Sequence, residues 1–88
     1  MDLEKIVVIG SNSFSGATFV RYLLEKGHRV IGFSRSQEYH DVFLPYKWLE
    51  AEVDNFQFYQ ADLNHDLEKI IKIIKQYKPN YIINFSAL

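Results

Sequence analysis

The chain has 88 residues, of which 48% are hydrophobic and 24% charged, and its formal net charge is −1. This composition is typical of a soluble globular domain and argues against disordered, fibrous and membrane-spanning classes. The chain contains no cysteine, which excludes a disulfide framework and a thiolate metal site. Because no apolar stretch reaches the ~18 residues that cross a bilayer and the N-terminus lacks the features of a signal peptide, we expect a cytoplasmic protein without a membrane partner.

The first part of the chain predicts a strand, a helix and a second strand. Residues 6–9 are a continuous β-branched run, typical of a strand buried on both faces of a parallel sheet. Residues 14–25 carry apolar side chains at roughly helical spacing, and Gly27 is a helix stop signal. Residues 30–33 are a second apolar run. A strand, a helix and a second strand in this order place the two strands parallel and side by side.

The middle of the chain has the weakest pattern. Residues 36–55 are mostly polar or irregular, with a short helix within 46–53 as one interpretation. Residues 56–61 alternate apolar and polar side chains, which predicts the third strand.

The last part predicts a helix and a fourth strand. Residues 67–77 have one apolar stripe, with Asn64 or Asp66 as the N-cap and Pro79 as the stop, and residues 81–85 follow as a strand. Four lysines at helical spacing then belong to the solvent-facing side of this helix, so we expect no nucleic-acid partner. They are Lys69, Lys72, Lys75 and Lys78.

Alternating strands and helices predict an α/β fold, a partial doubly wound Rossmann fold with a parallel sheet of strand order 3-2-1-4. The fourth strand would then have an uncovered apolar edge. This predicts that residues 1–88 are the N-terminal portion of a dinucleotide-binding Rossmann domain and that a substrate domain is absent. The alternative is an edge that pairs with another chain, including a second copy in a homodimer.

The segment between the first strand and the first helix carries the chemistry. Gly10 permits a sharp turn out of the strand, and the missing side chain at Gly16 lets the helix pack closely on the sheet. Backbone N–H groups and the positive end of the helix dipole would face the pyrophosphate of a dinucleotide, to which the Ser13 hydroxyl could donate. A purely structural helix-capping loop is the alternative. The candidate binding residues here are Gly10, Ser11, Asn12, Ser13, Phe14 and Gly16.

Four motifs in this order resemble the extended short-chain dehydrogenase/reductase family, in particular its nucleotide-sugar epimerases and dehydratases. They are the turn at 10–16, the strand entry at 27–32, Asp62-Leu63, and residues 84–87. The resemblance implies that the turn binds the pyrophosphate through Gly10, Ser13 and Gly16. It also implies that Asp62 and Leu63 contact the adenine, and that Ser86 and Ala87 line the cofactor near its ribose and phosphates.

The chain departs from the family pattern at two of these positions. Ser13 replaces the usual middle glycine of the turn, and Ser86 replaces the first of two alanines. Two structural alternatives also stay open: Asp62 could form only an Asx turn, and Asn84 could satisfy only backbone groups beyond the fourth strand.

The end of the second strand indicates which dinucleotide binds. NAD sites carry a carboxylate there for the ribose hydroxyls, whereas this chain has Ser34, Arg35 and Ser36. A guanidinium can bind a 2′-phosphate through paired charge-assisted hydrogen bonds. We therefore expect NADP, with NAD as the alternative.

Catalytic residues are not recognisable. The resembled family uses Tyr-x-x-x-Lys from a later helix, and the spacing from Tyr22 to Lys26 falls instead on the first helix. His28, His40 and His65 have no ligand spacing, so no metal site is expected. The sequence therefore predicts the NAD(P)-binding portion of a nucleotide-sugar epimerase, dehydratase or reductase that is inactive alone. The alternative is a dinucleotide-sensing regulatory or interaction module without catalysis.

Overall fold

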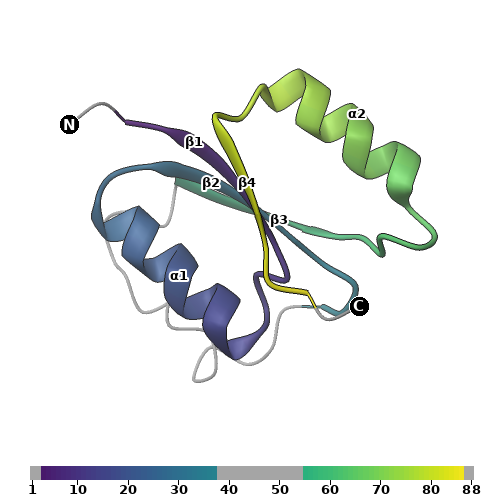
Figure 1. Ribbon diagram of the computed structural model, residues 1–88, viewed down its shortest axis with the longest axis horizontal. Helices are drawn as coiled ribbons and strands as arrows, with labels where there is room; N and C mark the ends of the chain where they lie inside the picture. The colour runs from purple at the N-terminus through teal and green to yellow at the C-terminus, as the bar shows by residue number, and fades with distance from the viewer. Residues whose placement is uncertain (1–2, 38–54, 87–88) are drawn as a thin grey trace.

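The computed structural model describes residues 3–37 and 55–86. The short helix interpreted within 46–53 lies outside these residues. The described elements follow in this order (Figure 1): β1 (Lys5–Ile9), α1 (Phe14–Glu25), β2 (Arg29–Ser34), β3 (Phe56–Gln60), α2 (Leu67–Tyr77) and β4 (Tyr81–Asn84).

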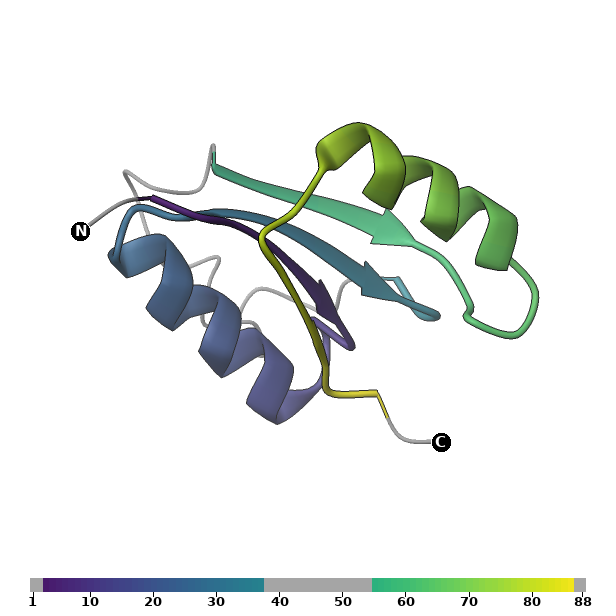
Figure 2. The same cartoon turned by 45° about the horizontal axis from the view of Figure 1, so that its top comes forward.

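The four strands form one parallel sheet of order β3-β2-β1-β4, which confirms the predicted fold class and strand order. Helices α1 and α2 lie on opposite faces of this sheet (Figure 2). Because β1 is central and alternate side chains of a strand point to opposite faces, its apolar run divides between the two helices. Ile6 and Val8 belong to the core beneath α1, and Val7 belongs to the core beneath α2.

Helix α1 packs through small and branched side chains. Ala17, Val20 and Leu24 are fully buried. Phe14 and Tyr22, which the apolar pattern included, are 87% and 54% exposed because they lie on the side of the helix turned away from the sheet. The predicted helix is therefore confirmed, but its buried face is narrower than its set of apolar residues.

Helix α2 also buries only part of its apolar stripe. Ile70 packs with Ile31 and Phe33 and is only 2% exposed. Leu67 and Ile71, by contrast, are 51% and 42% exposed. The lysines of this helix are exposed, as expected. Asp66 is the N-cap residue, but its side chain makes no capping hydrogen bond.

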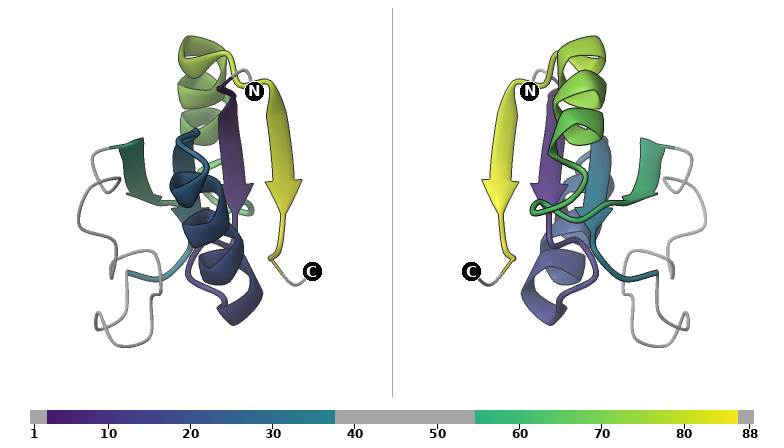
Figure 3. Two further views of the ribbon diagram at one scale, coloured as in Figure 1. Left: turned by 90° about the vertical axis from the view of Figure 1, so that its left-hand side faces the viewer. Right: turned by 90° about the vertical axis from the view of Figure 1, so that its right-hand side faces the viewer.

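Strands β3 and β4 are the two edges of the sheet (Figure 3). On β4 the side chains of Tyr81 and Ile82 are 58% and 52% exposed, so this edge is apolar, as the sequence predicted. Among the described residues, no helix is long and apolar enough to cross a membrane.

Candidate functional site

Gly10 turns the chain sharply at the end of β1. Its φ is +84°, a conformation that glycine adopts without steric cost. A Cβ atom at this position would lie 2.7 Å from the backbone nitrogen of Ser86, beyond β4. The turn therefore brings bare backbone to the carboxyl edge of the sheet.

Ser13 is the N-cap residue of α1. Its Oγ accepts a hydrogen bond from the Gly16 N–H at 3.0 Å and donates one to the Gly10 carbonyl at 2.7 Å. The hydroxyl proton is thus directed to Gly10, and donation to a phosphate would require that this bond be given up. The N–H groups of Phe14 and Ser15, in the first turn, have no acceptor within the helix and remain at its positive end.

Asn12 and Ser34 join this turn to the end of β2. The Asn12 backbone N–H donates to Ser34 Oγ at 3.0 Å, and its side-chain Nδ2 donates to the carbonyls of Ser36 and Gln37. Asn12 and Ser34 are 6% and 8% exposed. The two segments that the sequence assigned to phosphate and ribose therefore form one connected unit.

A pocket of about 300 Å³ opens at the carboxyl edge of the sheet and brings together most of the predicted residues. These are Gly10, Asn12, Ser13, Ser34, Arg35, Ser36, Asp62, Leu63 and Ser86.

Three of the other predicted residues, all within the described part of the chain, do not line this pocket. Ser11 is fully buried with its Oγ against Gly32, Phe14 is exposed, and Gly16 is buried against the Gly10 carbonyl. Ala87 lies outside the described residues. Ser11 and Gly16 therefore support the turn from the protein interior and do not face the pocket.

Asp62 forms an Asx turn at the rim of the pocket. Its Oδ1 accepts the Asn64 N–H at 2.8 Å, and its Oδ2 lies 3.2 Å from His65 Nδ1. The backbone bond from Asn64, then the bond to His65 and the charges of His65 and Arg35, hold the pKa of this carboxyl below its usual 3.8. The structural alternative for Asp62 is thus present, and its ionised carboxylate still faces the same pocket as Arg35.

Asn84 has a structural role of the kind considered from the sequence. Its Oδ1 accepts hydrogen bonds from the Ser86 N–H at 2.8 Å and the Ser86 hydroxyl at 2.6 Å. These bonds fix the turn after β4 that lies against Gly10.

Some lining residues had not been selected from the sequence: Ile9, Ala61, Asn64 and Phe85. They end β1, follow β3 and follow β4, so they share one edge of a parallel sheet. These lining residues can be identified from the sequence by their position at or after the carboxyl end of a strand, but not by their residue type.

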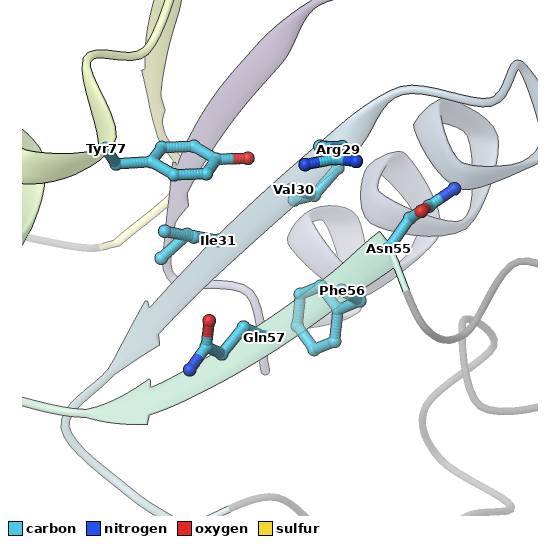
Figure 4. A pocket seen from close by; sticks show the side chains of 7 residues that line it. All are labelled: Arg29, Val30, Ile31, Asn55, Phe56, Gln57 and Tyr77. Atoms are coloured by element: carbon cyan, nitrogen blue, oxygen red, sulfur yellow. The ribbon is translucent and has the colours of Figure 1, made fainter.

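A second pocket, of about 250 Å³, lies at the opposite end of the sheet. Figure 4 shows the Tyr77 hydroxyl directed toward Arg29, with Ile31 and Gln57 nearby. Burial raises the pKa of Tyr77, and the charge of Arg29 opposes this shift. None of the predicted cofactor residues within 3–37 and 55–86 lines this second pocket.

Two further observations concern the remaining candidate groups of the described residues. Tyr22 is exposed on α1 and its ring centroid lies 5.6 Å from Lys26 Nζ, so the pair forms a surface cation–π contact away from the carboxyl-edge pocket. Within residues 3–37 and 55–86, no group of three or more His, Cys, Asp or Glu side chains could hold a metal ion.

The parallel order 3-2-1-4, the glycine turn and the pocket at the strand ends define a Rossmann-type α/β fold of the kind that binds nucleotides. A sequence model of the GDP-mannose 4,6 dehydratase family matches residues 7–88. The chain belongs to this family, which confirms the resemblance to extended short-chain dehydrogenase/reductase enzymes.

Two relatives have similar sequences. Protein CapI of Staphylococcus aureus is 27% identical over 84 residues, which cover 94% of this chain and 25% of that protein. An uncharacterized 37.6 kDa protein in the cld 5′ region of Escherichia coli O111:H- is 38% identical over 60 residues, covering 67% of this chain and 18% of that protein. The chain thus spans a quarter or less of the length of these relatives.

Solved structures share the fold. An epimerase, Mth375, of Methanothermobacter thermautotrophicus has a TM-score of 0.75 at 23% identity, covering 99% of this chain and 24% of that one. A dTDP-glucose 4,6-dehydratase of Bacillus anthracis, in complex with NAD, has a TM-score of 0.75 at 23% identity over 97% and 27% of the two chains. Bordetella bronchiseptica WbmH, in complex with NAD+, has a TM-score of 0.78 at 17% identity over 99% and 27%.

Proposed function

We propose that this chain is the NAD(P)-binding, N-terminal portion of a nucleotide-sugar epimerase, dehydratase or reductase. The observation that carries the proposal is the pocket at the carboxyl edge, where the glycine turn and the ends of β2, β3 and β4 converge. In open α/β sheets ligands bind in this crevice, where the strand order reverses. When bound, a nicotinamide dinucleotide supplies hydride transfer.

The turn fits a pyrophosphate because it presents backbone rather than side chains. Gly10 has no room for a Cβ atom, and the cap at Ser13 leaves the N–H groups of Phe14 and Ser15 available at the positive end of α1. Anionic oxygens placed there would accept these hydrogen bonds. The turn would thus bind and orient the phosphates.

The rim at Asp62 and Leu63 fits the adenine end. The Asp62 carboxylate can accept a hydrogen bond from an exocyclic amine, since each of its oxygens has more than one acceptor site. Its ionised state, held by Asn64 and His65, keeps it an acceptor. Leu63, on the same wall, would cover the base.

The preference for NADP depends on Arg35. Its backbone follows β2, its side chain is exposed, and it lines the pocket with Ser34 and Ser36. A 2′-phosphate there would meet one guanidinium and two hydroxyl groups, and no carboxylate follows β2 directly. NAD is the alternative, and NAD is the dinucleotide in several similar structures, including those of the dehydratase and WbmH.

Catalysis would need groups from outside this chain. Its Tyr-x-x-x-Lys spacing lies on α1, away from the pocket, and the chain spans about a quarter of Protein CapI. The whole protein would supply a tyrosine and lysine beyond residue 88 together with a nucleotide-sugar pocket. We therefore expect the 88-residue chain to bind the dinucleotide without turning over substrate.

Titration of the folded chain with NADPH and NADH tests the proposal. Saturable binding of NADPH, tighter than that of NADH, is expected. Arg35→Ala should weaken NADPH binding about tenfold or more and leave NADH binding nearly unchanged, because a charge-assisted bond is lost only with the 2′-phosphate. Lys72→Ala, which removes an exposed cation from α2, is the matched control and should change neither affinity.

The results of these titrations test the cofactor site and the preference for NADP separately. No saturable binding of either dinucleotide by a chain with native circular dichroism would contradict the cofactor site. Equal losses for NADPH and NADH in Arg35→Ala would contradict the NADP assignment and leave the site itself standing.

A further inference from the structure

Three consecutive backbone carbonyls after β2 accept hydrogen bonds from side-chain amides. The Arg35 carbonyl accepts from Gln60 Nε2 at 3.1 Å, at the end of β3. The carbonyls of Ser36 and Gln37 accept from Asn12 Nδ2 at 3.1 Å and 2.8 Å. The segment that carries Arg35 is thus held from the two strands that flank β2.

The two amides differ in burial. Gln60 is exposed, so water can replace its bond to the Arg35 carbonyl. Asn12 is 6% exposed, and its backbone N–H also bonds to Ser34 Oγ at 3.0 Å. Asn12 therefore forms the main connection between the glycine turn and the segment after β2.

Asn12 also carries a cost for folding. Its Oδ1 is buried without a hydrogen-bond partner among the described residues, and an unsatisfied buried carbonyl is destabilising. The two hydrogen bonds that its Nδ2 donates offset this cost, and both end on the segment that follows β2. The side chain is therefore specialised for holding that segment.

We propose that Asn12 is a positioning residue for dinucleotide selection: its amide fixes residues 34–37 so that the Arg35 guanidinium can meet a 2′-phosphate. This inference rests on the proposed function. Asn12 would act through Arg35, because its amide nitrogen is already bonded to two carbonyls and its Oδ1 is inaccessible to a ligand.

The geometry of guanidinium recognition explains why such positioning matters. Paired hydrogen bonds from Arg to a phosphate need both N–H groups in one plane with the acceptor oxygens, so a shifted backbone weakens them steeply. Arg35 shares the pocket wall with Asp62, whose carboxylate attracts it. A loosened segment would let Arg35 turn toward Asp62 instead of the ligand.

The test compares the ratio of NADPH to NADH affinity in the 88-residue chain and in variants whose fold is checked by circular dichroism. Asn12→Ala should lower this ratio about tenfold, as Arg35→Ala does. The double variant should show little further loss, because both changes remove the same interaction. Gln60→Ala is the control, and its ratio should stay within about threefold of the unmodified chain, since only an exposed bond is lost.

Several outcomes would overturn the inference. An unchanged ratio in folded Asn12→Ala, or losses in the double variant that simply add, would show that Asn12 does not act through Arg35. If Asn12→Ala does not fold, Asn12→Ser is measured instead, and failure of both to fold would assign Asn12 to folding rather than to selection. Absence of binding by the unmodified chain, or an unchanged ratio in Arg35→Ala, would overturn the corresponding part of the proposed function and this inference with it.

Discussion

The backbone of Gly10 lies directly against the backbone of Ser86, so that a Cβ atom on Gly10 would be 2.7 Å from the Ser86 nitrogen. This approach joins the end of β1 to the turn after β4. Both elements must be in place before the carboxyl-edge pocket exists. The same contact therefore links the stability of the fold to the shape of the site.

Gly10→Ala should destabilise the chain by roughly 3 kcal/mol or more, because it combines a positive φ with a clash that only a shift of the backbone can relieve. The free energy of unfolding in urea measures this change. Gly27→Ala is the matched control: its φ is +85°, but the nearest atom is the flexible Leu3 Cδ2 at 3.3 Å. We expect it to cost only about 1 kcal/mol, and equal losses in the two variants would mean that the contact with Ser86 contributes nothing.

Much of this fold was predictable because burial leaves a clear mark on the sequence. The β-branched run at 6–9 is the central strand, buried by a helix on each face, and its pattern has no polar interruption. The pocket was predictable as well, since the order 3-2-1-4 brings the strand ends near Gly10, Ser34 and Asp62 to one edge.

Contacts that depend on side-chain direction were not predictable. The sequence indicates that Asn12 lies in a turn, but the bond from its amide to Gln37 joins segments that come together only through the register of β1 with β2. The proton of Ser13 could go to a ligand or to Gly10, and composition does not distinguish the two. Phe85 enters the pocket because of where β4 ends, a property of pairing rather than of the phenylalanine itself.

Ser13→Ala should lower the free energy of unfolding by about 1 kcal/mol, the usual cost of removing an N-cap acceptor. Ser13→Gly should cost only a few tenths of a kcal/mol, since glycine is tolerated at this position. The control is Ser15→Ala, the same chemical change at an exposed position in the same turn, which should stay within about 0.5 kcal/mol of the unmodified chain. Urea unfolding of all three decides the point, and a loss in Ser13→Gly as large as in Ser13→Ala would contradict the capping role.

Lys78→Gly should stabilise the chain by about 1 kcal/mol. Lys78 ends α2 with φ 53° and ψ 61°, a left-handed conformation that is costly for a residue with a Cβ atom. Its backbone N–H donates to the Ile74 carbonyl at 2.9 Å, a bond that glycine keeps. Lys75→Gly, one turn earlier, should instead destabilise by about 1 kcal/mol because that residue has helical geometry. Thermal unfolding of the two variants should therefore move in opposite directions.

The acid dependence of stability should reveal the ionised state of Asp62. Its pKa in the folded chain is lowered from 3.8, first by the Asn64 backbone bond and then by His65. A lowered folded pKa gives stability that is present above the unfolded pKa and is lost as the pH falls through the folded pKa. Lowering the pH from about 5 to about 2 should therefore weaken the unmodified chain more than Asp62→Asn, which keeps the Oδ1 acceptor and removes the charge.

His65→Ala tests the order of these causes for Asp62. It removes the second contribution to the lowered pKa and leaves the backbone bond from Asn64 at 2.8 Å intact. We expect the acid-induced loss of stability in this variant to be smaller than in the unmodified chain but larger than in Asp62→Asn. Urea unfolding at a series of pH values measures all three, and complete removal of the acid dependence by His65→Ala would mean that the imidazole, rather than the Asn64 backbone, holds the carboxylate ionised.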